Sequence, residues 1–266
     1  MRPVALTIAG SDSGGGAGIQ ADLKAFSALG VFGASVITAV TAQNTQGVRA
    51  VEDISPQTVA AQIDAVCEDM TVGATKIGMV SRRETIAAIA AGLARHGLRP
   101  VLDPVMVATS GDRLLQPDAI ATLRAELLPL ATLVTPNLPE AALLTDTPVA
   151  EDEAAMIAQA EAILKAGAGA VLVKGGHGSG AESTDILVTP AGLTRYSAPR
   201  IATPNTHGTG CTLSAAIAAG LARGLPLDAA VGEAKDYLQA ALAAGARLVV
   251  GKGRGPVHHF HRWWPA

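Results

Sequence analysis

Short apolar segments alternate with helical patterns along this chain, and this alternation constrains the fold more than any other feature. Segments rich in β-branched and apolar residues predict buried strands at residues 4–9, 34–41, 75–80, 100–103, 133–137 and 170–174. Helical patterns separate most of them, notably at residues 55–70, 83–95, 153–166 and 227–248. Strands joined by helical crossovers favour a mostly parallel sheet. We therefore expect one α/β domain over residues 1–266, with a short hairpin around residues 190–192.

Composition narrows the classes of protein that this chain can represent. Hydrophobic residues make up 49% of the chain and charged residues 16%, which supports a substantial core and excludes intrinsic disorder. The net charge of −3 gives no electrostatic reason to expect nucleic acid. Cys67 and Cys211 are too isolated for a disulfide framework or a structural zinc site. Because no signal peptide or membrane-spanning run is evident, we expect a soluble, cytoplasmic protein.

The stretch TPNTHGTGCT at residues 203–212 predicts a tight glycine loop that leads into a helix. A helix N-terminus offers unpaired N–H groups and partial positive charge, and Gly208 and Gly210 let a ligand approach the backbone, so the loop suits an anion such as phosphate. The same helix end is expected to lower the pKa of Cys211 and make it a usable base or nucleophile. The alternative is a simple turn before a buried helix, with Cys211 packed in the core.

Polar residues also follow the first two predicted strands, where α/β proteins bind ligands. The glycine loop at residues 10–18 matches neither the dinucleotide nor the P-loop pattern, so it suits a small polar ligand contacted by Asp12 or Asp22. Gln43 follows the second strand and offers both donors and an acceptor, which suits an aminopyrimidine-like edge. Both loops could instead be turns without a ligand.

Further polar groups follow the later strands. Asp103 ends one strand and precedes an unusually apolar loop, residues 105–113, that could line a pocket. Asn137 and Glu140 could share a metal-bound water shell, or could only cap the helix that follows. Lys174 places a cation at another strand end. The tail holds His258, His259 and His261 without a carboxylate or cysteine, so a packed or exposed tail is favoured over a metal site.

Taken together, these groups favour phosphoryl transfer. That reaction needs anion stabilisation, a metal shell and a group that orients an acceptor hydroxyl. Acyl transfer by Cys211 would need a nearby base, and His207, four residues away across a tight loop, is poorly placed for this role. Acyl transfer would also leave the lysine and the carboxylates without a function.

Seven short motifs follow one another along the chain: GSDSGGGAGIQAD (10–22), AQN (42–44), KIGM (76–79), VLDPVM (101–106), TPNLPE (135–140), KGGH (174–177) and NTHGTGC (205–211). Each motif is weak alone, but the ordered set resembles the hydroxymethylpyrimidine/phosphomethylpyrimidine kinases, thiamine-biosynthesis enzymes of the ribokinase-like superfamily. The similarity extends from about Ala5 to the GPVHHFHRWW tail. It implies a single three-layer α/β/α domain and, as a family-level expectation, a homodimer.

The resemblance also implies an activity and a set of roles. The expected reaction is ATP- and Mg²⁺-dependent phosphorylation of 4-amino-5-hydroxymethyl-2-methylpyrimidine and then of its monophosphate. Cys211 would accept or orient the proton of the hydroxymethyl group, beside an anion hole formed by Gly208, Thr209 and Gly210. The remaining implied site residues are Gln43, Asp22, Gly10, Met79 and Val105 for the pyrimidine, Lys174, Thr206 and Asn137 for ATP, and Asp103 and Glu140 for the metal.

One departure and two rival functions accompany this resemblance. The family more often has proline after the first aspartate of the loop, where this chain has Ser13, so the loop is expected to be more flexible. A pyridoxine or pyridoxal kinase of the same superfamily is the closest rival, because some members with cysteine at this position phosphorylate the hydroxymethyl group of vitamin B6. Pyridoxal has a ring hydroxyl where the pyrimidine has an amino group, so the preference is expected to depend on Gln43 and its neighbours. A non-catalytic ligand-binding module would have no need of Cys211, Lys174 and Glu140.

Overall fold

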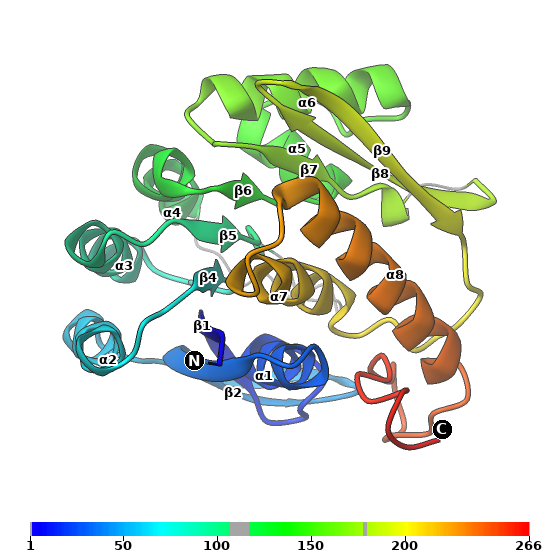
Figure 1. Ribbon diagram of the computed structural model, residues 1–266, viewed down its shortest axis with the longest axis horizontal. Helices are drawn as coiled ribbons and strands as arrows, with labels where there is room; N and C mark the ends of the chain where they lie inside the picture. Colours follow the sequence, from blue (N-terminus) through cyan, green and yellow to red (C-terminus); the bar gives the residue numbers. More distant parts are fainter. Residues whose placement is uncertain (1, 107–116, 178–179, 266) are drawn as a thin grey trace.

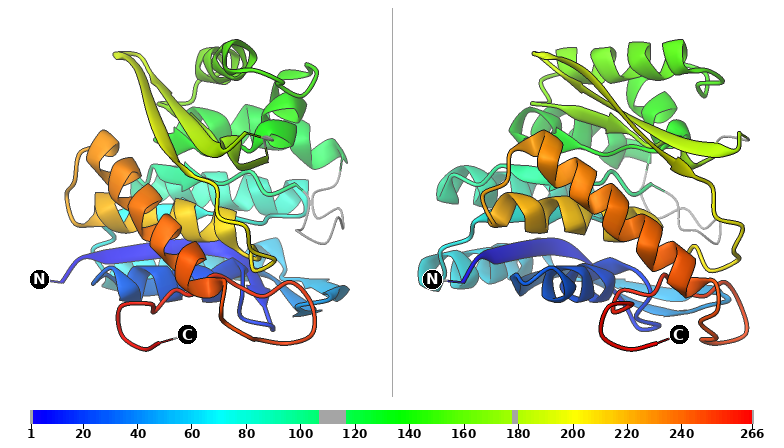
Figure 2. Two further views of the ribbon diagram at one scale, coloured as in Figure 1. Left: turned by 90° about the vertical axis from the view of Figure 1, so that its right-hand side faces the viewer. Right: turned by 45° about the vertical axis from the view of Figure 1, so that its right-hand side comes forward.

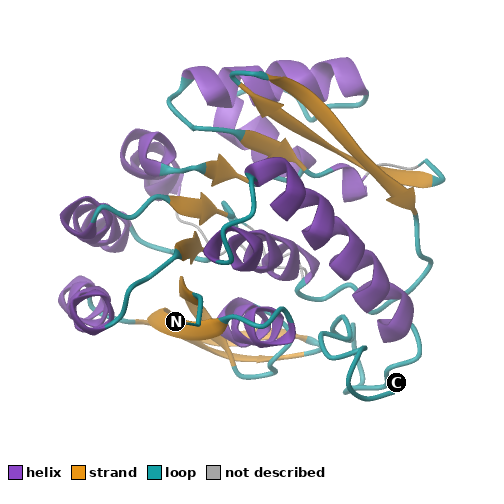
Figure 3. Cartoon of the chain, viewed as in Figure 1, coloured by secondary structure: helices purple, strands orange, loops and turns teal. Residues whose placement is uncertain are grey.

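The computed structural model describes residues 2–106, 117–177 and 180–265, and a nine-stranded sheet lies at its centre (Figures 1 and 3). The order across the sheet is β3-β2-β1-β4-β5-β6-β7-β8-β9. The strands are β1 (Val4–Asp12), β2 (Phe32–Asn44), β3 (Gly47–Asp53), β4 (Ala74–Ile77), β5 (Pro100–Leu102), β6 (Leu133–Val134), β7 (Val171–Val173), β8 (Glu182–Thr189) and β9 (Gly192–Pro199).

Six neighbouring strands at the centre of the sheet run parallel, in the order β2-β1-β4-β5-β6-β7. The antiparallel pairings, β3 with β2, β7 with β8 and β8 with β9, lie toward the two edges. The β8–β9 hairpin confirms the turn expected around residues 190–192. Strand β3 was not predicted from the sequence. It follows β2 after a tight turn and pairs with it from Ala39–Asp53 to Asn44–Gly47.

Helices cover both faces of the sheet and produce three layers, as the two turned views show (Figure 2). One apolar cluster joins the sheet to α2 (Pro56–Asp69), α3 (Arg83–His96), α4 (Pro117–Thr122), α5 (Leu138–Thr145) and α6 (Glu153–Lys165). The other joins it to α1 (Gly18–Ala28), α7 (Thr209–Ala222) and α8 (Leu227–Gly245). The predicted three-layer α/β/α fold with a mostly parallel sheet is confirmed.

Local sequence explains how several of these helices begin and pack. The Ser55 side chain accepts the N–H of Thr58, and Pro56 occupies the first turn, as expected for the start of α2. Helix α7 is buried over most of its length, and its run of alanines lets it pack closely between the sheet and α8. Among the described residues, no helix is both long and apolar enough to cross a membrane.

Strand boundaries differ from the sequence prediction where loops were expected. Strand β1 continues to Asp12 and β2 to Asn44, so Gly10 and Gln43 lie on strands. Each extension is stabilised by pairing with its neighbour, and Asp12 pairs with Thr41. Residues 107–113 of the predicted pocket loop lie outside the described residues.

Candidate active site

The glycine loop before α7 has a geometry that only glycine tolerates. Gly208 is the N-cap residue and lies in the left-handed region, with φ 77°. A Cβ atom on Gly208 would lie 1.9 Å from the carbonyl oxygen of Gly16, so the two glycine loops are in direct backbone contact. The N–H of Thr209 lies 3.3 Å from the carbonyl of Thr206, and the Thr209 hydroxyl donates to the same oxygen. Helix α7 begins at Thr209, and Gly210 lies half-buried in its first turn, where backbone N–H groups have no partner within the helix.

Cys211 lies in this first turn and is half-buried. The backbone N–H of Gly18, at the start of α1, donates to its sulfur, so two helix N-termini meet at the thiol. Burial nevertheless raises the pKa of Cys211 to about 11. The nearby Lys76 ammonium lowers this pKa, whereas the carboxylates of Asp22 and Asp103 raise it further. The expected lowering of the thiol pKa was therefore wrong, because burial outweighs the helix termini.

A lysine–carboxylate cluster lies beside the glycine loop. The Lys174 Nζ atom is 2.8 Å from Asp103 Oδ1 and 3.9 Å from Glu140 Oε2. A Cβ atom on Gly210 would lie 3.3 Å from Lys174 Nζ and 3.5 Å from Asp103 Oδ2, so cluster and loop are adjacent. Thr135 and Ser214, which sequence reasoning missed, also donate to Asp103.

Burial and charge set the ionisation of this cluster. Burial opposes the charge of Asp103, but Lys174 and Lys76 outweigh it and lower the pKa of that carboxyl group. Burial likewise opposes the charge of Lys174, but Asp103 and Glu140 raise its pKa. Burial raises the pKa of Glu140 to about 7. The cluster therefore holds one firmly charged pair and one carboxyl group that titrates near neutrality.

Asn137 and Glu140 form a capping box at the start of α5. Asn137 Oδ1 accepts the Glu140 N–H at 2.9 Å, and Glu140 Oε2 accepts the Asn137 N–H at 2.8 Å. The capping interpretation of these residues is thus confirmed. Their expected roles toward ATP and metal remain predictions.

The described residues contain no group of three or more His, Cys, Asp or Glu side chains that could hold a metal ion by themselves. Mg²⁺ is commonly held by one or two carboxylates together with waters and substrate phosphates. Asp103 and Glu140 fit that donor set, because they lie next to a loop suited to phosphate.

Four of the five residues expected at a pyrimidine site lie at one edge of the sheet. A Cβ atom on Gly10 would lie 3.3 Å from the sulfur of Met79, so β1 approaches this side chain closely. Gln43 lies half-buried on β2, and Val105, also half-buried, follows Asp103. A pocket of about 380 Å³ opens at Gln43 and is lined by Gln43, Asn44, Thr45, Gln46, Gly47, His207, Gly253 and Arg254.

Asp22 is the exception, because its side chain is fully buried. Its two carboxylate oxygens lie 3.0 and 2.9 Å from Lys76 Nζ, and one of them also accepts the Thr7 hydroxyl at 2.6 Å. A direct contact between Asp22 and a ligand does not fit this burial. Asp22 instead holds a buried lysine that lies close enough to Cys211 to affect the pKa of the thiol.

The C-terminal segment contacts the glycine loop before α7, and the sequence analysis did not predict this contact. Gly255 donates its N–H to Asn205 Oδ1 at 3.0 Å and accepts the His207 N–H at 3.1 Å. Further along, His259 Nε2 lies 3.0 Å from the Thr212 hydroxyl, in the first turn of α7. The histidine-rich tail is packed at His258 and His259, which are buried, and exposed at Trp263 and Trp264.

Solved structures place this architecture in a known class. The chain superimposes on the crystal structure of an ADP complex of Bacillus subtilis pyridoxal kinase with a TM-score of 0.88, at 35% identity, over 97% of this chain and 98% of that one. A phosphomethylpyrimidine kinase structure from Clostridium difficile gives a TM-score of 0.81 at 46% identity, over 91% of this chain and all of that one. The fold is that of the ribokinase-like small-molecule kinases.

Sequence comparisons narrow the class to one family. The phosphomethylpyrimidine kinase family model matches residues 12–258. Hydroxymethylpyrimidine/phosphomethylpyrimidine kinases from Rhizobium meliloti and Escherichia coli are 69% and 56% identical, over 99% and 98% of both chains. The chain belongs to the phosphomethylpyrimidine kinase family, as the ordered motifs predicted.

Proposed function

We propose that this protein phosphorylates the hydroxymethyl group of 4-amino-5-hydroxymethyl-2-methylpyrimidine with ATP and then phosphorylates the resulting monophosphate. The observation that carries the proposal is that two groups of residues meet at the glycine loop before α7, which leads to Cys211: the Lys174–Asp103–Glu140 cluster lies beside Gly210, and Gln43 contacts His207 of the same loop. Family membership and relatives at 69% and 56% identity support the same reaction.

The roles follow from position and charge. The N–H groups at Gly208, Thr209 and Gly210 stabilise negative charge on the transferred phosphoryl group. Lys174 supplies a positive charge beside this loop and, with Thr206 and Asn137, contacts the phosphates of ATP. Mg²⁺, when bound through Asp103 and Glu140 and water, neutralises phosphate charge.

Cys211 orients the acceptor hydroxyl and takes its proton late in the transfer. With a pKa of about 11 in the unliganded protein, the thiol is almost entirely protonated at neutral pH. Phosphoryl transfer tolerates this, because its loose transition state places little demand on an early base. The ammonium group of Lys76 is the nearby charge that favours the thiolate.

Pyridoxal is the second candidate substrate, because structures of pyridoxal kinases superimpose on this chain at 35% and 30% identity. The hydroxymethylpyrimidine/phosphomethylpyrimidine kinases are more similar in sequence. Gln43 is the residue expected to separate the two substrates, since it contacts the ring substituent that differs between them.

The test is product analysis by mass spectrometry after incubation with ATP, Mg²⁺ and the hydroxymethylpyrimidine. Monophosphate followed by diphosphate supports the proposal, and unchanged pyrimidine refutes it. Gln43→Ala is expected to raise the KM for the pyrimidine at least tenfold while the KM for ATP stays near its wild-type value. Gln57→Ala, which removes an exposed glutamine of α2, is the matched control.

A further inference from the structure

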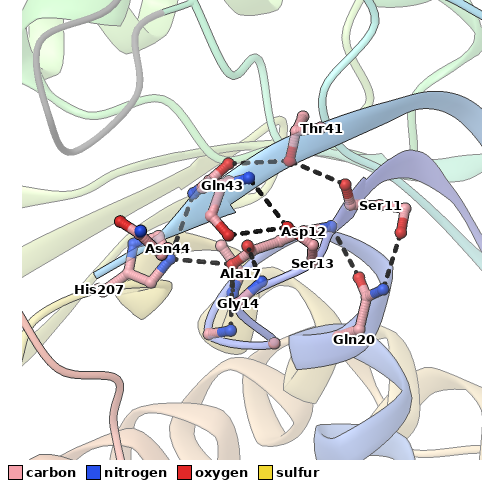
Figure 4. A network of polar contacts seen from close by, with 12 residues as sticks. Ser11, Asp12, Ser13, Gly14, Ala17, Gln20, Thr41, Gln43, Asn44 and His207 are labelled. Carbon is pink, nitrogen blue, oxygen red and sulfur yellow. Dashed lines mark hydrogen bonds and ion pairs between the residues drawn. The ribbon is translucent and has the colours of Figure 1, made fainter. Parts of the chain in front are cut away.

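The buried carboxylate of Asp12 connects the two glycine loops of the site (Figure 4). Asp12 ends β1 and is 3% exposed. Its Oδ1 atom accepts the Gly14 N–H at 2.8 Å, and its Oδ2 atom accepts the N–H groups of Gly16 and Ala17 at 3.0 and 2.8 Å. Oδ2 also lies 3.0 Å from His207 Nε2, in the loop that carries Gly208.

This arrangement fixes the position of a hydrogen atom on His207. Burial opposes the charge of Asp12, but hydrogen bonds from His207 and from the N–H groups of Ala17 and Gly14 outweigh it and lower the pKa of the carboxyl group. An ionised carboxylate only accepts hydrogen bonds, so His207 Nε2 must carry the hydrogen and donate it to Asp12. The ring has little room to turn, because its Cδ2 atom lies against Gly16. The backbone of this residue is also held in place, since the main-chain N–H of His207 donates to the carbonyl of Gly255.

The Gln43 side chain meets this histidine from the other side. Its Nε2 atom lies 3.4 Å from His207 Nε2, and its Oε1 atom lies 3.2 Å from the Thr41 hydroxyl. With the hydrogen of His207 on Nε2, this orientation sets one donor against another. It also asks the single Thr41 hydroxyl hydrogen to serve both Gln43 and the carbonyl of Ser11, 3.0 Å away.

Turning the amide of Gln43 by 180° removes both conflicts. The N–H of His207 Nε2 donates mainly to Asp12 at 3.0 Å, and Gln43 Oε1 becomes its second, more distant acceptor at 3.4 Å. Gln43 Nε2 donates to the Thr41 oxygen, while the Thr41 hydrogen goes to Ser11. No donor then faces another donor, and the Thr41 hydroxyl hydrogen serves one acceptor only. One lone pair of Oε1 and one N–H of Nε2 are left over for a ligand, in a fixed order along β2.

We propose that Asp12 and His207 are positioning residues that fix the amide orientation of Gln43 and thereby favour an aminopyrimidine over a ring hydroxyl. This inference rests on the proposed function. An aminopyrimidine edge offers an N–H beside a ring nitrogen acceptor, which complements a fixed oxygen and N–H pair. A ring hydroxyl, as in pyridoxal, can also donate to Gln43 Oε1, but the ring atoms beside it are carbons, so the Nε2–H of Gln43 is left without the acceptor that the pyrimidine ring nitrogen supplies.

The test compares His207→Asn with His207→Gln. The asparagine amide is too short to reach Asp12, whereas the Nε2 atom of glutamine can occupy the position of the imidazole Nε2 and donate. The kcat/KM ratio of hydroxymethylpyrimidine to pyridoxal is expected to fall about tenfold in His207→Asn and to recover in His207→Gln. In a Gln43→Ala background, His207→Asn is expected to lower the ratio no further.

A matched control separates positioning from general damage to the loop. Gln20 accepts the Asp12 N–H at 2.8 Å on the side of the loop away from Gln43, so Gln20→Ala is expected to leave the ratio near its wild-type value. If His207→Asn lowers kcat/KM for both substrates equally, or acts fully in the Gln43→Ala background, the inference is wrong.

Neutron diffraction of the unliganded protein tests the orientation without any activity. Deuterium on Gln43 Nε2 facing Thr41, and on His207 Nε2 facing Asp12, supports the inference. Deuterium on Gln43 Nε2 facing His207 overturns it. If the wild-type protein binds no pyrimidine, the proposed function is refuted. The neutron result still decides the hydrogen positions, because it does not depend on pyrimidine binding.

Discussion

Replacing Asp22 with leucine is expected to destabilise the protein severely. Asp22 and Lys76 are both fully buried, and the ammonium nitrogen lies 2.9 Å from the nearer carboxylate oxygen. Asp22→Leu leaves the Lys76 ammonium buried without its partner and deprives the Thr7 hydroxyl of its acceptor. Breaking a buried pair from one side costs about 3–5 kcal/mol. Urea denaturation followed by circular dichroism is expected to show a loss of this size in the free energy of unfolding.

The double variant Asp22→Leu/Lys76→Met separates stability from function. Two apolar side chains of similar volume commonly replace a buried ion pair at little cost, so most of the lost stability is expected to return. The remaining deficit is expected to be about 1–3 kcal/mol, because the buried Thr7 hydroxyl still lacks its acceptor. Turnover is expected to stay low, because Lys76 is the nearby cation that favours the Cys211 thiolate. If Asp22→Leu keeps wild-type stability and only raises the KM for the pyrimidine, Asp22 is a ligand contact and this reasoning is refuted.

Three further predictions concern the glycine loop and the tail. Gly208→Ala is expected to lower kcat at least a hundredfold, because the added methyl group displaces the loop. Gly224 also has a positive φ but faces open space, so Gly224→Ala is expected to leave kcat unchanged. Equal effects of the two substitutions on kcat would contradict the role assigned to Gly208. Cys211→Ala is expected to lower kcat about 10²–10⁴-fold, while pyrimidine binding measured by calorimetry stays nearly unchanged. Cys67→Ala is the control. If Cys211→Ala keeps most of its activity, this thiol is not the proton acceptor. Burial lowers the pKa of His259 to about 3, so the folded state resists a proton that the unfolded chain accepts near pH 6.5. Neutral His259 therefore contributes fully to the free energy of unfolding above pH 6.5, and this contribution falls by about 2 kcal/mol between pH 7 and pH 5. In urea titrations, the free energy of unfolding of His259→Asn is expected to depend less steeply on pH than that of wild type. The same dependence in both proteins would contradict this.

The sequence predicted the strands that carry a strong apolar signal and missed the one that does not. Strand β3 contains Arg49, Glu52 and Asp53 and is largely exposed, so its residues favour a loop. It forms because β2 extends past its predicted end and offers a free edge for pairing. Local pattern cannot reveal such a strand, since its stability comes from its neighbour.

The site was predicted where polar residues follow strands and was misjudged where burial decides. Gly208, Lys174 and Asp103 could be grouped because each sits at a predictable element boundary. Lys76, the partner of Asp22, lies 54 positions away along the chain, and no local pattern pairs them. The raised pKa of Cys211 has the same origin, because burial and the charges around the thiol come from distant segments.

ATP consumption measured with three separate acceptors shows whether this protein is a kinase and which ring it prefers. ADP production would be measured with Mg²⁺ and ATP against the hydroxymethylpyrimidine, its monophosphate and pyridoxal, with Cys211→Ala as the control for background hydrolysis. We expect turnover of both pyrimidines, with kcat/KM at least tenfold above that for pyridoxal. Preference for pyridoxal would contradict the assignment of Gln43 to an aminopyrimidine, and turnover of none of the three would contradict the proposed kinase.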